Sequence, residues 1–157
     1  VARRMAEKLL ALAFESDDPI TLYIGSPGGH VESGDTIFDL IRYIKPDVRI
    51  IGTGWVGSIA THIYLAADKD NRFALPNTRF LIHQPSGGFG GDAADIEIHA
   101  REILKTRERI NGIIAERTGQ SIDRVGEDTQ RDYWMSAEES VEYGLVGKII
   151  SDISEVG

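Results

Sequence analysis

One serine stands where a turn of small residues meets the expected start of a helix. Ser58 directly follows the segment 52–57 and is the first residue of the apolar pattern of residues 58–67. A serine hydroxyl is a weak nucleophile until a neighbouring base takes its proton, so a catalytic Ser58 needs a histidine within hydrogen-bond reach. Val56 and Ala60 stand where the Gly-x-Ser-x-Gly elbow of α/β-hydrolases has glycines. A serine after glycine often only caps a helix, so Ser58 requires partners before it indicates chemistry.

Four histidines are candidates for that base: His30, His62, His83 and His99. His83 ends an apolar strand just before Pro85, and the carboxyl ends of strands line ligand crevices in open α/β sheets. His62 lies four residues beyond Ser58 on the same expected helix, where side chains lean toward the N-terminus. Position therefore ranks His83 first and His62 second.

Acids that could orient the histidine are more numerous. Those after His83 include Asp92, Asp95, Asp123, Asp128 and Asp132, and spacing does not choose among them. A Ser, His, Asp chain order would differ from the hydrolase, chymotrypsin and subtilisin orders. The residue types nevertheless predict a serine peptidase.

Two glycine-rich segments offer backbone N–H groups that no side chain obstructs. Ser26-Pro27-Gly28-Gly29 is a turn in which the backbone can approach a substrate closely. The second segment, residues 86–91, contains Gly87, Gly88, Phe89 and Gly90. It could pair its main chain with an extended polypeptide, with little sequence preference. Composition alone favours a plain flexible loop for this second segment.

The helices and strands that would position these residues can be predicted from the spacing of apolar residues. Along the chain this spacing alternates between a period of two, typical of strands, and a period of about 3.6, typical of helices. The pattern predicts helices over 5–13, 34–41, 58–67 and 93–118, and strands over 20–24, 48–52, 80–83 and 146–150. Ser136 to Glu139 is a capping-box pattern that starts a further short helix, which Gly144 would end. Strand–helix–strand repetition with short connections predicts an α/β fold with a parallel sheet and right-handed crossovers.

The long helix carries a narrow apolar stripe with heptad-like spacing. Its members are Ile96, Ala100, Ile103, Ile110 and Ile114. Such a stripe on an otherwise charged helix favours docking onto another helix over burial in the chain's own core, although core packing is the commoner cause.

Composition narrows the classes of partner. The 157 residues predict one domain, 1–157, and a net charge of −8 argues against nucleic-acid or anionic-membrane partners. The absence of cysteine excludes disulfide, zinc-thiolate and cysteine-nucleophile chemistry and fits a cytoplasmic protein. No apolar run approaches ~20 residues and no signal peptide is visible. Because the chain opens at Val1 inside an expected helix, we expect an N-terminal segment to be missing.

Five blocks of the sequence resemble the proteolytic subunit of the Clp protease. They are Tyr23–Gly29, Arg72–Asn77, Ile82–Pro85, Asp95–Leu104 and Met135–Glu139. The resemblance runs the length of the chain and implies a ClpP/crotonase-like α/β fold, in which a long helix and a glycine-rich strand protrude as a handle. It implies a serine endopeptidase that cuts unfolded polypeptides to short peptides through an acyl-enzyme, itself independent of ATP, with no cofactor and no metal.

Matched motif by motif, the resemblance implies roles for single residues. The catalytic residues fall on Ser58, His83 and Asp132, and the oxyanion hole on the N–H groups of Gly29 and Ile59. A docking pocket for an AAA+ unfoldase falls on Tyr23, Ile51, Phe73 and Leu75. Gln130 and Arg131 match a ring–ring contact in a homo-oligomer of two seven-membered rings, with glutamine where an acid is common.

Other departures from the family pattern cluster near the nucleophile: Gly25, Trp55, Gly57, Ile59 and His62. They bear on substrate preference and on assembly rather than on the catalytic set. Two alternatives remain at this point. A crotonase-like acyl-CoA enzyme would use the glycine-turn N–H groups without needing Ser, His and Asp. A catalytically weak ring subunit would regulate an active paralogue.

Overall fold

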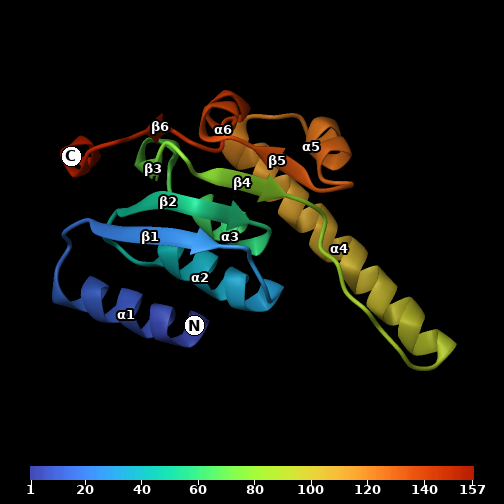
Figure 1. The fold of residues 1–157 in the computed structure, drawn as a ribbon. Coiled ribbons are helices and arrows are strands. Elements are labelled where there is room, and N and C mark those ends of the chain that lie inside the picture. Colours follow the sequence, from blue (N-terminus) through green and yellow to red (C-terminus); the bar gives the residue numbers. More distant parts are fainter.

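The computed structural model describes residues 1–157 and contains one curled six-stranded sheet (Figure 1). The strands are β1 (Ile20–Ser26), β2 (Val48–Gly57), β3 (Arg72–Ala74), β4 (Arg79–Ile82), β5 (Tyr133–Met135) and β6 (Lys148–Ile149). Their order is β5-β4-β2-β3-β6, and β1 pairs with the other edge of β2. Strand β2 holds β3 along Ile50–Gly52 and β4 along Trp55–Gly57. All pairs are parallel except β4 with β5.

Six α-helices surround this sheet: α1 (Ala2–Glu15), α2 (Val31–Tyr43), α3 (Ile59–Tyr64), α4 (Ala93–Thr118), α5 (Ile122–Asp128) and α6 (Ala137–Tyr143). Two short 3-10 turns, η1 (Lys69–Asn71) and η2 (Ile153–Val156), complete the chain. Helices α1, α2 and α3 lie on one side of β1 and β2, while α4 extends far beyond the sheet (Figure 1). None of the helices has the length and apolar character needed to cross a bilayer.

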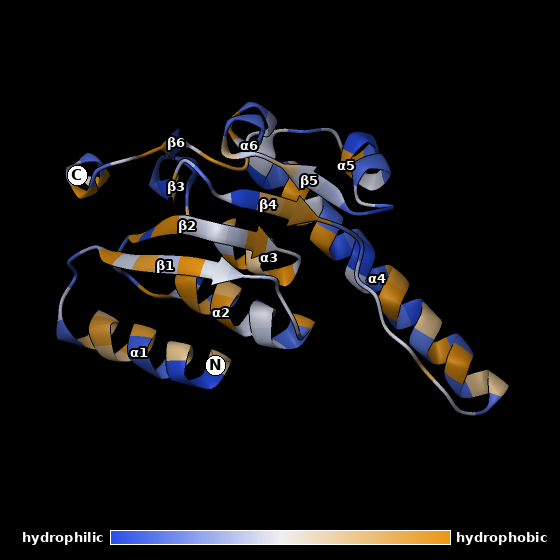
Figure 2. Cartoon of the chain, in the orientation of Figure 1, coloured by the Kyte–Doolittle hydropathy of each residue, from blue (hydrophilic) through white to orange (hydrophobic).

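The main core fills the space between the sheet and α1, α2 and α3. In β1, Leu22 and Ile24 face inward while Thr21 and Tyr23 face out, the alternation expected of a strand with one buried face. The apolar side chains of α2 and α3 meet this face, and the apolar colouring of Figure 2 follows the same division. Gly34 in α2 packs directly against the Ile59 side chain of α3.

Arg117 clamps the long helix α4 to the end of α3. Its guanidinium donates to the carbonyl oxygens of Leu65 at 2.9 Å and Ala67 at 2.8 Å. It also lies 3.1 Å from Asp68, and this hydrogen bond lowers the pKa of that carboxyl below its usual range. A cation at the carbonyl end of a helix is favourable because it meets the negative end of the helix dipole. The clamp fixes the helix that carries Ser58 at its start.

The predicted parallel α/β organisation is confirmed, and the structure adds short elements that the periodicity missed. Strands β3 and β5 have three residues each, too few to show a period, and β5 runs antiparallel to β4. Strand β2 continues past the predicted end at Gly52 to Gly57, because its second half pairs with β4. Helix α3 ends at Tyr64 rather than at residue 67. The capping box at Ser136 forms as predicted, and Gly144 ends α6 with a φ of 95°.

The apolar stripe of α4 divides into two parts. Ile110 and Ile114 are buried in the chain's own core, whereas Ile96 is 47% exposed. The prediction that the stripe as a whole favours docking onto another helix is therefore wrong for its C-terminal part. Residues 84–92, which include the glycine-rich segment 86–91, run beside the exposed part of α4 without forming a strand (Figure 1). Phe89 of this segment stacks on His99 with ring centroids 4.6 Å apart. The long helix protrudes as the resemblance implies, but the glycine-rich strand expected beside it is not formed. We call the protruding helix and this segment the handle.

The contact between Gly34 and Ile59 predicts that adding one methyl group at position 34 destabilises the protein. A Cβ at position 34 would lie 2.1 Å from Ile59 Cγ1, so Gly34→Ala must push α2 and α3 apart. We expect Gly34→Ala to lower the free energy of unfolding by about 1–3 kcal/mol in urea denaturation. Gly112→Ala in α4 is the matched control, because nothing lies within 4 Å of a Cβ there. A double mutant with Ile59→Ala should lose less than the sum of the two single changes, and strict additivity would contradict this contact.

Candidate active site

Ser58, His83 and Asp132 form a continuous chain of hydrogen bonds. His83 Nε2 lies 2.8 Å from Ser58 Oγ, and His83 Nδ1 lies 3.0 Å from Asp132 Oδ1. With Nδ1–H donating to the carboxylate, Nε2 is left to accept the serine proton. The structure thus brings together the first-ranked histidine with one of the five candidate acids. The imidazole is one-quarter exposed and the Asp132 carboxylate is mostly exposed, so the site is open to a large substrate.

Ser58 occupies a strained turn between strand β2 and helix α3. It is the one non-glycine residue of the chain with a positive φ, 55°. Such a conformation costs about 1–3 kcal/mol and persists where the surrounding structure enforces it. The Ser58 N–H donates to Leu81 O at 2.9 Å, and the Thr61 hydroxyl lies within 3.1 Å of the carbonyl oxygens of Val56 and Leu81. These bonds to β4 hold the serine out at the end of the sheet.

The loop that carries Asp132 is tied to the residue after His83. Gln84 N–H donates to Thr129 O at 2.6 Å, and the Gln84 side-chain amide donates to Gln130 O at 3.0 Å. Thr129 is fully buried, and its hydroxyl lies 3.1 Å from Asn111 Oδ1 on α4. Two hydrogen bonds therefore join the segment that carries Asp132 to the segment that carries His83.

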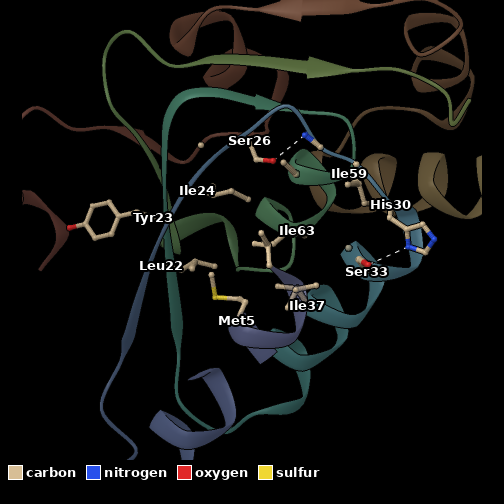
Figure 3. Close-up of a pocket in the computed structure, with 17 residues that line it drawn as sticks. Met5, Leu22, Tyr23, Ile24, Ser26, His30, Ser33, Ile37, Ile59 and Ile63 are labelled. Atoms are coloured by element: carbon tan, nitrogen blue, oxygen red, sulfur yellow. Dashed lines mark hydrogen bonds between the residues drawn. The ribbon is translucent and has the colours of Figure 1, made fainter. Parts of the chain in front are cut away.

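The glycine turn before α2 lies directly against the nucleophile. A Cβ on Gly28 would be 2.7 Å from Ser58 Cβ and 3.1 Å from Ile59 N, and Gly28 has a φ of 102°. Ser26 Oγ accepts from Gly28 N–H at 3.1 Å and braces the turn (Figure 3). Gly29 N–H makes no hydrogen bond within the chain, and Ile59 N–H, first in α3, has no partner inside the helix. Two N–H groups without partners in the chain thus lie close to Ser58 in sequence or in space.

Two cavities lie near Ser58, and the larger one borders the glycine turn. The larger, about 430 Å³, lies between α1, β1 and α2, and it touches Gly28, Gly29 and Ile59 but none of Ser58, His83 and Asp132 (Figure 3). The smaller, about 20 Å³, is lined by Ser58 and His83 themselves. Of these two cavities, the smaller is the one in contact with the Ser58–His83 pair.

The remaining histidines lie away from the hydrogen-bonded chain. His30 is exposed beside Ser33, and His99 is on the handle. His62, the second-ranked base, is 2% exposed and stacks on Phe38 with ring centroids 4.4 Å apart. Burial lowers the pKa of His62, and the Asp35 carboxylate partly opposes that effect. Neither ring nitrogen of His62 makes a hydrogen bond, so His62 does not bond to the Ser58 hydroxyl, although both residues line the small cavity.

A cationic and aromatic cluster beside the site was not predicted from the sequence. The Trp55 and Trp134 rings lie 5.4 Å apart, and the Arg79 guanidinium sits 4.4 Å above the Trp134 ring. In the sequence, Trp55 stands out only as a departure from the family pattern. The cluster depends on the pairing of β2, β4 and β5, which the sequence does not reveal.

The residues matched to docking and ring contacts occupy two separate places. Tyr23, Ile51 and Phe73 stand in register across β1, β2 and β3, with Tyr23 exposed and the other two buried under η2. Leu75 follows β3 and is partly exposed. Arg131 is exposed and makes no ion pair within the chain. No group of three or more acidic or histidine side chains is arranged to hold a metal ion.

Comparisons with protein families, with known sequences and with solved structures all identify relatives of one kind. A family model described as Clp protease matches residues 1–152. The chain is 56% identical over 156 residues to the ATP-dependent Clp protease proteolytic subunit 3 of Rhizobium meliloti (strain 1021), an alignment that covers 99% of this chain and 80% of that relative. It is 55% identical to subunit 2 of Pseudomonas aeruginosa, with 99% and 78% covered. A mutant of ClpP1 from Listeria monocytogenes has a TM-score of 0.94 at 52% identity, covering 99% of this chain and 87% of that chain.

The close approach of Gly28 to Ser58 predicts that the turn controls the reactivity of the serine. Gly28→Ala combines a 2.7 Å collision with Ser58 Cβ and an unfavourable φ, so the serine and the two free N–H groups must separate. We expect the rate of Ser58 labelling by a serine-directed fluorophosphonate to fall by a factor on the order of 10². Gly126→Ala, where nothing lies within 4 Å, is the control. Equal labelling rates for the two variants would show that the turn does not position the serine.

Proposed function

The chain belongs to the Clp protease family, and we propose that its Ser58, His83 and Asp132 are the catalytic triad of a serine endopeptidase that hydrolyses unfolded polypeptides. The observation that carries this proposal is the unbroken hydrogen-bond chain from Ser58 Oγ through His83 to Asp132, at 2.8 and 3.0 Å. These distances are within hydrogen-bond reach without any rearrangement.

In the acylation step, His83 Nε2 takes the proton of Ser58 as Oγ attacks the peptide carbonyl carbon. The imidazolium is stabilised by the Asp132 carboxylate at Nδ1, and it then gives its proton to the leaving amine. The products of this step are an ester on Ser58 and a free peptide amine. Water activated by the same histidine hydrolyses the ester and restores the serine.

The N–H groups of Gly29 and Ile59 would hold the oxyanion of both tetrahedral intermediates. Neither donor is used inside the chain, and Gly28 allows the turn to approach the nucleophile closely. One such donor contributes about 10²–10³ in turnover. The proposal needs no cofactor and no metal ion.

The glycine-rich segment beside the handle is the proposed polypeptide-binding strand. Gly87, Gly88, Phe89 and Gly90 leave most of the segment's backbone groups without partners in the chain. An extended substrate that pairs with this backbone would be held mainly by main-chain hydrogen bonds, with little dependence on its side chains. The complete Ser, His and Asp set disfavours both the acyl-CoA enzyme and the inactive regulatory subunit.

We further propose that the chain is one domain that acts in the cytoplasm within two stacked seven-membered rings, served by an AAA+ unfoldase. The exposed handle and the unpaired Arg131 support a contact between rings, since each offers groups that the chain itself leaves unused. The proposed unfoldase surface is limited to the exposed residues Tyr23 and Leu75. Ile51 and Phe73, matched to the same docking pocket, are buried under η2 and support that surface from beneath.

Removing a triad side chain should nearly abolish peptide hydrolysis. We expect Ser58→Ala and His83→Ala to lower kcat by a factor on the order of 10⁴–10⁶, and Asp132→Asn to be roughly tenfold to a hundredfold less damaging. The measurement is turnover of a fluorogenic peptide by each purified variant. His30→Ala, which changes an exposed histidine, is the control. An inactive His62→Ala protein beside an active His83→Ala protein would reassign the base.

The neutral side chain at position 130 should weaken the contact between rings. A glutamine offers Arg131 of an opposing subunit a hydrogen bond about half as strong as a carboxylate would. We therefore expect Gln130→Glu to raise both the double-ring fraction in sedimentation and the rate of peptide turnover across a range of protein concentrations. If Gln130→Glu changes neither quantity and Arg131→Ala is harmless, these residues do not couple assembly to activity.

A further inference from the structure

The small cavity next to Ser58 has an apolar wall and one polar group without a hydrogen bond. Its apolar lining comes from four different segments, as Val31, Ile59, Ile82, Pro85, Ile110 and Ile114. Its polar lining residues are Ser58, Thr61, His62 and His83. A volume of about 20 Å³ is enough for a single water molecule.

Thr61 and His62 differ in how their polar atoms are used. The Thr61 hydroxyl is satisfied by backbone carbonyl oxygens at 3.0 and 3.1 Å. His62 is 2% exposed, yet neither of its ring nitrogens makes a hydrogen bond. Leaving a buried polar group unpaired costs about 1–3 kcal/mol, so an unpaired imidazole next to a reacting serine calls for a function.

The neighbours of His62 determine which nitrogen is the acceptor. Its Nε2 lies 3.1 Å from Asp35 Oδ1, close but outside hydrogen-bond alignment, and Arg109 holds the same carboxylate at 2.7 and 2.8 Å. Burial lowers the pKa of His62, so the imidazole is neutral. A negative charge facing Nε2 keeps the single proton on that nitrogen, which leaves Nδ1 as an acceptor.

We propose that His62 determines specificity, by accepting a hydrogen bond from the side chain of the substrate residue whose carbonyl Ser58 attacks. This inference rests on the proposed function of Ser58. His62 stands four residues along α3 from Ser58, about 6 Å along the helix axis, which suits a side chain of glutamine's length. The preferred side chain is an uncharged hydrogen-bond donor, with glutamine ahead of apolar side chains of equal length.

The preference follows from what each side chain does to the cavity. A glutamine whose amide end enters the cavity donates to Nδ1, so this nitrogen is no longer unpaired. A methionine of the same length leaves Nδ1 without a partner, which is how a hydrogen-bonding site rejects an apolar analogue. A glutamate brings a second negative charge toward Asp35 and offers no donor. The three side chains are nearly equal in size and differ mainly in this chemistry.

Three fluorogenic peptides that differ only in glutamine, methionine or glutamate before the cleaved bond test the proposal on the full-length chain. We expect kcat/KM for the glutamine peptide to exceed that for methionine about tenfold or more, with glutamate the poorest. His62→Phe keeps an aromatic ring against Phe38 but removes the acceptor, so the order of glutamine and methionine should reverse. His62→Asn restores an acceptor and should restore the glutamine preference.

His30→Phe is the matched control, because it makes the same change at an exposed histidine and should leave the ratio at its wild-type value. A wild-type protein that cleaves the methionine peptide as well as the glutamine peptide overturns the proposal, whatever the stability of the variants. An active His62→Phe protein with an unchanged ratio also overturns it. If the protein cleaves none of the three peptides and fluorophosphonate leaves Ser58 unlabelled, the proposed function is refuted and this inference with it.

Discussion

The left-handed backbone at Ser58 is the constraint on which the rest of the site depends. A non-glycine residue with a φ of 55° is stable only if its neighbours enforce it, and three elements do so. Strand β4 accepts the Ser58 N–H at Leu81 O, and helix α3 begins at the next residue. Gly28 closes the third side, where an added Cβ would lie 2.7 Å from Ser58 Cβ. The same contacts that hold the strain also point the hydroxyl at His83 and leave two N–H groups beside it.

Much of this site could be predicted from residue types, because the nucleophile and the base stand at element ends. Ser58 follows a strand and starts a helix, and His83 ends an apolar strand, both of which local patterns reveal. The acid could not be chosen in the same way. Asp132 reaches His83 through the bonds of Gln84 to Thr129 and Gln130, which join segments 45 to 46 residues apart. Pairing over such separations leaves no trace in local periodicity.

Local sequence patterns also predict only part of the fold, because some elements depend on pairing between distant segments. The bounds of α4 agree with the prediction, since 26 residues give several turns of pattern, whereas α1 and α2 extend beyond their predicted ends. Strands β3 and β5 exist because β2 and β4 provide edges for them, not because three residues prefer to be extended. The buried state of His62 was also beyond local patterns, because it depends on Phe38, Asp35 and Arg109 from two other helices.

Helix α4 is continuous in sequence, but its two ends have different local stabilities. Its C-terminal turns are fixed by Ile110, Ile114 and the Arg117 clamp, so their amide hydrogens should exchange with solvent only on near-global unfolding. Its N-terminal turns contact little beyond the glycine-rich segment, so they should open locally at a small free-energy cost in an isolated subunit. A gradient of exchange protection along one helix therefore measures how much of the chain's order comes from its own fold and how much must be supplied by a neighbour.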